Sequence, residues 1–261
     1  MGKGYVFDMH GLMGEEAQGH GEPARLAEAW KGLEKDVVNG ADYVIVVSNA
    51  MKRMVCASYG KPPDKVIVAA NGSDVYPRPA HFAMPFKIVY AGNFAYYEAV
   101  WDFVRTAETV PCEKHEFVLI GDGVLKRDLL RYVGGRHLNV IYRGKRTREE
   151  TLVMLSESQV GIAPSTKDIV RQVACPLKVL DYAACGLPVV TVDVGEWSDT
   201  IREYDCGIVT DESDPAAFAD AIRRLEDEDL WRRKSSNGRY MVGEKFTWSR
   251  VLQPMLALYR A

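Results

Sequence analysis

The sequence predicts an α/β fold, with a doubly wound parallel sheet and an incomplete α/β segment in front of it. From Phe86 onward, short apolar runs alternate with helical patterns, as in a parallel sheet covered by helices on both faces. The run from Leu187 to Val192 is almost entirely apolar, which is typical of a strand buried on both faces. A helical pattern leads directly into that run, and helix followed by strand is half of a βαβ unit.

The composition limits the kind of protein. The chain has 261 residues, enough for one large domain or two smaller ones. Its 47% hydrophobic and 26% charged residues are ordinary for a globular protein, and a net charge of -3 argues against a nucleic-acid-binding protein that relies on bulk charge. Five scattered cysteines without a CxxC pair indicate reduced thiols, so we expect no zinc or other metal site.

The chain has no sign of a membrane-spanning or targeting segment. No apolar stretch approaches the roughly 18 to 20 residues that a membrane span requires, and Met1-Gly-Lys-Gly-Tyr lacks the apolar core of a signal peptide. We therefore expect a cytoplasmic protein, with peripheral contact to a membrane left open.

The first seventy-odd residues predict too few elements for a complete domain. A strand begins at Tyr5 with nothing before it to pack on, and the Asn71-Gly72 pair predicts a turn. Closely spaced prolines then mark a boundary at about residues 75 to 86. The elements expected before it are a strand from residue 5, a helix over 23–38, a strand over 41–48, a helix over 49–59 and a strand over 65–70.

The second part carries its small and polar residues at the ends of strands. Strands are expected over 86–91, 116–121, 138–143, 159–163, 187–192 and 207–210. The residues at or just after their ends include Gly92, Asn93, Gly121, Arg143, Gly144 and Ser165. Each glycine taken alone could simply terminate an element. Because parallel strands end on one edge, these loops converge, and glycines there let backbone amides approach a ligand closely.

The stretch from Cys175 to Val190 is the most informative one. Pro176 suits the first helical position and Gly186 the residue just past the helix end. A helix start can hold a phosphate, and Lys178 adds a mobile charge there, with Asp181 on nearly the same face. The alternative is that Lys178 and Asp181 form a solvated pair on an ordinary helix.

His10 follows the first strand, where α/β folds place their ligands. It either contacts substrate or is structural or merely exposed. Glu15 and Glu16 are best explained as the first turn of a helix, where carboxylates favour the helix dipole.

Other motifs are absent or weak. A dinucleotide fingerprint starting at Gly121 would need glycine where Lys126 stands, and no GxxxxGK[ST] motif occurs. The acidic run Asp227-Glu-Asp229 is better explained as a solvated helix face than as a metal site.

Five segments follow one another in a characteristic order: Ala41-Asp-Tyr-Val-Ile-Val-Val-Ser48, Lys65-Val-Ile-Val-Ala-Ala-Asn-Gly-Ser-Asp74, Val89-Tyr-Ala-Gly-Asn93, Leu119-Ile-Gly-Asp-Gly123 and Cys175-Pro-Leu-Lys-Val-Leu-Asp-Tyr-Ala-Ala-Cys-Gly-Leu-Pro-Val-Val190. Their order resembles that of the large group 1 family of retaining glycosyltransferases with two Rossmann-like lobes (GT-B type). The resemblance implies a Rossmann-like nucleotide-sugar-binding domain at residues 77–245, after a truncated remnant of the acceptor-binding lobe at residues 1–76. We expect a C-terminal helix at residues 246–261 to pack back on that remnant.

The resemblance also implies roles for individual residues. Asp181 stands at the acidic position that binds the donor ribose, and Gly92 lets the glycine loop approach the phosphates. His10 matches an acceptor-lobe histidine that lines the transfer site. The residues expected at the donor are Gly92, Asn93, Gly121, Arg143, Gly144, Ser165, Pro176, Leu177, Lys178 and Asp181, and the catalytic residues expected are His10 and Lys178.

Two positions depart from the family pattern. The family often has a second acid eight residues before the ribose acid, touching the transferred sugar, and this chain has Val173 there. The arginine and lysine that usually follow the glycine loop are replaced by Asn93-Phe-Ala-Tyr-Tyr-Glu-Ala. Lys178, Arg171 or Lys167 is expected to supply that charge instead.

The expected activity is transfer of a sugar from a UDP- or GDP-linked donor to a hydroxyl of an unknown glycan, lipid or small-molecule acceptor. The family resemblance implies a retaining reaction that needs no metal or other cofactor. The alternative is a donor-binding half, or an inactive module, that needs a separate acceptor-lobe chain. A nucleotide-sugar epimerase or phosphorylase on the same plan suits the motif order less well.

Overall fold

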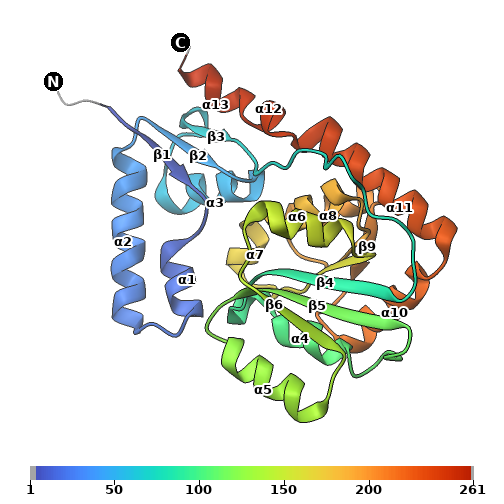
Figure 1. Cartoon of the computed structure of the whole chain (residues 1–261). Coiled ribbons are helices and arrows are strands. Elements are labelled where there is room, and N and C mark those ends of the chain that lie inside the picture. Colours follow the sequence, from blue (N-terminus) through green and yellow to red (C-terminus); the bar gives the residue numbers. More distant parts are fainter. Residues whose placement is uncertain (1–3, 260–261) are drawn as a thin grey trace.

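The computed structural model describes residues 4–259 and contains two parallel sheets (Figure 1). The first sheet has the order β1-β2-β3, and the second has the order β6-β5-β4-β7-β8-β9. All neighbouring strands in both sheets run parallel. The α/β fold class with a Rossmann-like arrangement is thus confirmed.

The first sheet and its helices form a small unit with its own apolar core. Its elements are β1 (Val6–Met9), α1 (Met13–Gly19), α2 (Ala24–Gly40), β2 (Tyr43–Val46), α3 (Asn49–Tyr59), the short 3-10 turn η1 (Pro63–Lys65) and β3 (Val66–Val68). Glu15 and Glu16 lie in the first turn of α1, as expected from the helix dipole. Ser48 caps α3 by accepting from the Met51 amide at 2.9 Å.

The second sheet forms the larger unit. Its strands are β4 (Phe86–Asn93), β5 (His115–Asp122), β6 (Val140–Gly144), β7 (Val160–Ala163), β8 (Val189–Val192) and β9 (Gly207–Thr210). Its helices are η2 (Tyr96–Glu98), α4 (Val100–Thr106), α5 (Lys126–Arg136), α6 (Arg148–Ser156), α7 (Ile169–Val173), α8 (Leu177–Cys185), α9 (Gly195–Glu203), α10 (Pro215–Leu225) and α11 (Glu228–Met241). Every residue of β7 and β8 is buried, which explains why their sequences show no alternation and are apolar except for Thr191 of β8.

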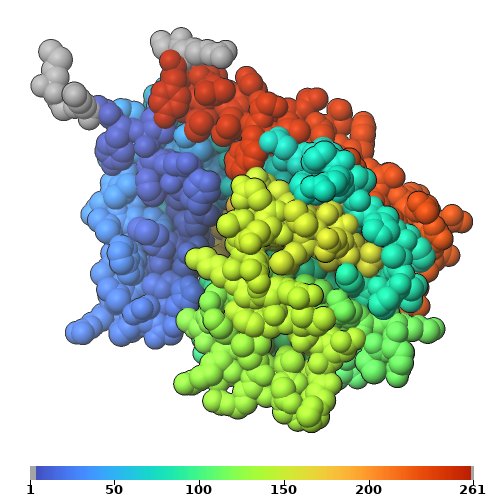
Figure 2. Space-filling model, in the orientation of Figure 1, coloured from blue at the N-terminus to red at the C-terminus, as the bar shows by residue number. Residues whose placement is uncertain are grey.

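The end of the chain returns to the first unit. After α11 come the π-helical turn η3 (Val242–Phe246), α12 (Trp248–Val251) and α13 (Gln253–Leu258), and α13 contacts β3. Figure 2 shows this C-terminal segment packed across the top of both units. No helix among residues 4–259 is long and apolar enough to cross a membrane.

Two local predictions were wrong. Pro176 is the N-cap of α8, in an extended conformation, and the helix begins at Leu177. The predicted turn at Asn71-Gly72 does not form: residues 71–76 make neither a turn nor a bend, and Gly72 is not among the glycines with positive φ. Gly72 instead permits close packing, since a Cβ there would lie 3.0 Å from the carbonyl oxygen of Phe246. The Ser73 amide donates to that same oxygen at 2.9 Å.

Candidate functional site

A cleft of about 630 Å³ opens at the carboxyl ends of β4 and β5 and the first turn of α8. This is the edge of a parallel sheet at which α/β folds bind their ligands. Its lining residues include Gly92, Asn93, Glu98, Gly121, Lys145, Arg148, Arg171, Pro176, Leu177, Lys178 and Asp181. The convergence of the predicted strand-end loops on one cleft therefore holds for β4, for β5 and, through Lys145, for β6, but not for the loop after β7.

Two glycines let the strand ends approach closely. Gly121 has φ +136°, a conformation that side chains rarely adopt, and a Cβ there would overlap the carbonyl oxygen of Gly92. A Cβ on Gly92 would stand 3.0 Å from Cε and 3.1 Å from Nζ of Lys178. The two loops and the lysine thus fill the space that side chains at residues 92 and 121 would occupy.

The first turn of α8 presents unpaired donors. No side chain caps this helix, and the amides of Leu177 and Lys178 have no acceptor among residues 4–259. Gly186 ends the helix in the left-handed conformation with φ +81°, as the sequence predicts. A helix start with unpaired amides is a general anion-binding element.

Lys178 belongs to a buried charged cluster. Its ammonium donates to Glu98 and, at 3.3 Å, to the Tyr90 hydroxyl, and it lies 4.7 Å from the centre of the Tyr90 ring. Arg171 pairs with the other oxygen of Glu98 at 3.4 Å. Burial lowers the pKa of Lys178, although Glu98 opposes this. Only 10% of the Lys178 side chain is exposed, so the interpretation as a solvated pair with Asp181 was wrong.

Asp181, about one turn further along α8 than Lys178, is the centre of a second polar cluster. Its Oδ1 atom accepts from the Ser73 hydroxyl at 2.7 Å and from the Arg148 guanidinium at 2.7 Å. The hydrogen bond from Arg148 to Asp181 raises the pKa of Arg148. Asp181 Oδ2 has no hydrogen-bond partner among the described residues.

Four of the predicted site residues do not line this cleft. His10 follows β1, where its ring is 59% exposed and lies 3.1 Å from Asp8. Arg143 is exposed and Gly144 ends β6 with φ +76°. Ser165 is buried, and its hydroxyl accepts from Arg171 Nε at 3.1 Å. The other predicted donor residues line the cleft: Gly92, Asn93, Gly121, Pro176, Leu177, Lys178 and Asp181.

The two family departures have structural explanations. Val173 packs in the apolar cluster of the first unit, with Met9 and Met51, and does not line the cleft. Of the expected substitute cations, Lys178 and Arg171 line the cleft, whereas Lys167 pairs with Glu212 outside it.

Sequence reasoning missed Glu98, Arg148, Tyr90 and Ser73. Glu98 lies in the segment that replaces the family's basic residues. That departure from the family pattern is the one feature of the sequence that could have drawn attention to Glu98. Arg148 follows Thr147, which forms a capping box with Glu150 at the start of α6. A capping box indicates where a helix starts, but it does not indicate that Arg148 reaches Asp181.

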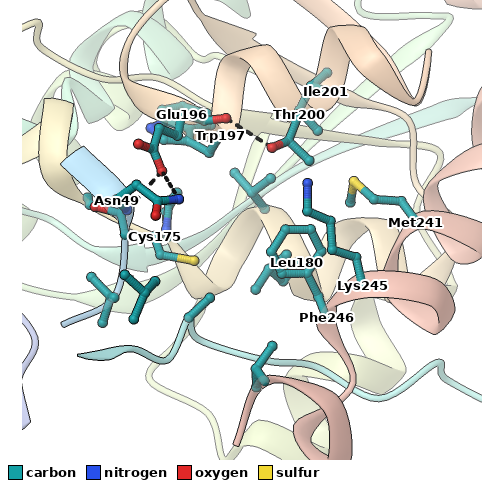
Figure 3. Close-up of a pocket in the computed structure, with 18 of the residues that line it drawn as sticks. Asn49, Cys175, Leu180, Glu196, Trp197, Thr200, Ile201, Met241, Lys245 and Phe246 are labelled. Carbon is teal, nitrogen blue, oxygen red and sulfur yellow. Dashed lines mark hydrogen bonds between the residues drawn. The ribbon is translucent and has the colours of Figure 1, made fainter. Parts of the chain in front are cut away.

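A second, smaller cavity of about 270 Å³ lies on the other side of the first turn of α8 (Figure 3). It is mostly apolar and lies between the two units, with Leu180, Trp197, Ile201 and Phe246 in its wall. Burial raises the pKa of the Cys175 thiol there to about 11. The glycine loops and Lys178 do not line it, so the larger cleft is the candidate for a phosphorylated ligand.

No group of three or more His, Cys, Asp or Glu side chains suited to a metal ion occurs among residues 4–259. The cations that line the larger cleft are Lys145, Arg146, Arg148, Arg171 and Lys178.

Two parallel-sheet units, with a cleft lined by unpaired amides and cations at the carboxyl edge of the larger one, have the arrangement of the two-lobed GT-B glycosyltransferases. The chain belongs to the group 1 glycosyltransferases, because the model described as "Glycosyl transferases group 1" matches residues 85–228, more than half of the chain. Residues 1–76 match the model "Glycosyltransferase Family 4".

Known relatives agree with this assignment. D-inositol 3-phosphate glycosyltransferase of Acidothermus cellulolyticus is 26% identical over 251 residues, which are 87% of this chain and 55% of that protein. Sucrose-phosphate synthase from Thermosynechococcus elongatus superposes with a TM-score of 0.82 at 22% identity, covering 100% of this chain and 68% of that one. S. aureus TarM, solved in complex with UDP, has a TM-score of 0.80 at 18% identity, with 99% and 51% covered. The chain spans about half the length of the curated relatives it matches.

Proposed function

We propose that the protein binds a nucleoside-diphosphate sugar in the larger cleft and transfers the sugar to an acceptor hydroxyl. The observation that carries this proposal is the first turn of α8, where unpaired amides and the Lys178 ammonium face two glycine-bearing strand ends. A diphosphate needs N–H donors, positive charge and room for a close approach. This turn offers all three.

Asp181 is the proposed ligand of the donor ribose. Its Oδ1 atom is held by Ser73 and Arg148, which fixes the carboxylate, and Oδ2 remains for the ribose hydroxyls. The distance along α8 fits, because Asp181 lies about one turn beyond Lys178. The diphosphate and the ribose would then contact successive turns of the same helix.

The proposed chemistry is displacement at the anomeric carbon with departure of the nucleoside diphosphate. Negative charge grows on the leaving group, and donors already held in place stabilise that charge most effectively. Lys178, Arg171 and the α8 amides would do this without a divalent metal ion. Retention of the anomeric configuration is proposed from the family resemblance, as is a place for His10 beside the transferred sugar.

UDP is the first donor nucleotide to test, because S. aureus TarM has the same fold and was solved with UDP. GDP is the second. The acceptor class, whether glycan, lipid or small molecule, is left open. A cytoplasmic location is proposed from the five free cysteines.

The second candidate function is donor binding by a chain that needs a separate acceptor lobe. It is favoured by the length comparison, since this chain spans about half of the relatives it matches. Both candidates predict nucleotide binding. They differ in whether sugar transfer occurs without a further chain.

Isothermal titration with UDP and GDP tests the shared step. We expect one nucleotide to bind, and Lys178→Ala to weaken binding about tenfold to a hundredfold, the usual loss for a charged hydrogen bond. In an active complex, the same variant should lower turnover more than donor affinity. Lys35→Ala, at an exposed position of α2, is the matched control and should bind normally. If the wild-type protein binds neither nucleotide, the proposal is wrong, whereas binding without transfer favours the second candidate.

A further inference from the structure

Glu98 is a buried carboxylate inside the donor cleft, and the proposed function so far gives it no role. It is the last residue of η2 and only 7% exposed. Its two oxygens accept from the Lys178 ammonium and from Nη1 of Arg171. All three side chains line the same cleft.

The stability of the fold does not explain this cluster. Taking three charged side chains out of water is costly, and apolar replacement of a buried ion pair often leaves stability unchanged or improves it. An apolar core begins directly beside the cluster, where Tyr90, Phe94 and Phe103 are fully buried. Apolar side chains could therefore have filled this space.

The contacts of Lys178 leave one of its donors for a ligand. An ammonium has three N–H groups. One donates to Glu98 and one to the Tyr90 hydroxyl, and the third has no acceptor among residues 4–259. A Cβ added at Gly92 would stand 3.1 Å from Nζ, so the ammonium that carries this third donor lies at the glycine-bearing end of β4.

We infer that Glu98 is a positioning residue for donor binding, which keeps Lys178 protonated and aimed so that its remaining N–H meets the donor diphosphate. This inference rests on the proposed function. Arg171 balances the charge of Glu98, so the three groups together leave one net positive charge for an anionic ligand.

The electrostatics of the cluster agree with this arrangement. Burial lowers the pKa of Lys178 and Arg171 lowers it further, while Glu98 raises it. Burial raises the pKa of Glu98, but Lys178 and Arg171 together bring it below its usual range, so Glu98 is ionised at neutral pH. The charged groups that act on Lys178 are Glu98 of η2 and Arg171 of α7, and its ammonium donates to the Tyr90 hydroxyl of β4. The other charged groups that line the same cleft are Asp122 of β5, Lys145 and Arg146 after β6, Arg148 of α6 and Asp181 of α8.

The test is the pH dependence of nucleotide binding in Glu98→Gln. Without the carboxylate, Lys178 keeps its burial and its like-charged neighbour, so it loses its proton at a lower pH than in the wild-type protein. We expect wild-type affinity for UDP, or for GDP if that is the nucleotide bound, to change less than twofold between pH 7 and 9. Affinity of Glu98→Gln should fall about tenfold over the same range, where the phosphate charge, with a pKa of about 6, is constant.

Three controls make the outcome decisive. Glu113→Gln, at an exposed position away from the cleft, should behave like the wild-type protein. Adding Lys178→Met to Glu98→Gln should remove the pH dependence, because the group that titrates is gone. Glu98→Asp keeps the charge at a longer distance and should show a smaller loss, about threefold at pH 9. If Glu98→Gln does not fold, the pH dependence of binding is measured with Glu98→Asp instead.

The result also separates this inference from the proposed function. If the wild-type protein binds no nucleotide, the proposed function fails. If the wild-type protein binds and the folded Glu98 variant shows the same affinity and pH profile, the positioning role of Glu98 is overturned while donor binding stands.

Discussion

Gly92 lies so close to the side chain of Lys178 that a Cβ at residue 92 would stand 3.0 Å from Cε and 3.1 Å from Nζ of the lysine. Gly92 comes from the end of β4 and Lys178 from the first turn of α8, so the contact joins two elements of one cleft. A glycine is needed here for space and not for φ, because residue 92 is absent from the positive-φ glycines among residues 4–259.

This contact predicts the effect of Gly92→Ala. The new methyl group meets the flexible end of Lys178, which can move by a few tenths of an ångström, so we expect a loss of stability below about 1 kcal/mol. The ammonium is displaced from the phosphate position, and affinity for UDP should fall about tenfold. Titration calorimetry and urea denaturation measure the two effects. Gly134→Ala, in open space on α5, is the control and should not affect binding.

Asp181→Asn tests the ribose contact separately from the phosphate contacts. The variant removes the negative charge that pairs with Arg148 and is proposed to face the ribose, while the α8 amides and Lys178 stay in place. We expect affinity for UDP to fall about tenfold and affinity for inorganic pyrophosphate to change less than twofold. Asp128→Asn, whose carboxylate pairs with Arg131 at the surface, should change neither. An equal loss for both ligands would mean that Asp181 serves the phosphates instead.

The sequence was sufficient to predict most of the fold because its patterns are local. Helix α3 at residues 49–59 and strand β9 at 207–210 have the predicted bounds. Strands β4 and β5 extend beyond their predicted ends. In each strand a glycine and a polar residue end the apolar pattern, but the two strands stay paired there, Gly92 with Gly121 and Asn93 with Asp122. An apolar run marks the buried part of a strand and not its last hydrogen bond.

Only the site residues that lie together on one short segment were predictable from the sequence. Lys178 and Asp181 stand on one short helix with its own start and stop signals, so their proximity follows from helix geometry. Glu98, at the end of η2, is 80 residues away from its partner Lys178 in sequence, and Arg148, at the start of α6, is 33 residues away from its partner Asp181. No local pattern encodes such contacts, since they depend on how β4 and α6 pack beside α8.

The buried thiols predict a graded reactivity toward a disulfide reagent such as DTNB. The thiolate is the reactive form, and burial raises the pKa of Cys175 to about 11 and those of Cys185 and Cys206 to about 12. At pH 8, about 0.1% of Cys175 is then thiolate. We expect the exposed Cys112 to react first and these three thiols to react at least a hundredfold more slowly.

The variant Cys112→Ser should remove the fast phase and leave the slow phases unchanged. In guanidinium chloride, all five cysteines should react at similar rates, because the burial that sets the differences is lost. Fast reaction of Cys185 or Cys206 in the folded protein would contradict their burial.

Tyr182→Phe tests how α8 is fixed to the second sheet. The Tyr182 side chain is fully buried, and its hydroxyl accepts from the Ala91 amide at 2.8 Å, one residue before Gly92. Phenylalanine fills the same space but leaves this buried N–H without a partner, which typically costs about 1 to 3 kcal/mol. We expect urea denaturation to show a loss of this size. The control Tyr132→Phe, whose hydroxyl donates to Glu108 at the surface, should lose less than about 0.5 kcal/mol. Equal stability of the two variants would show that the Ala91 amide finds another acceptor when the hydroxyl is removed.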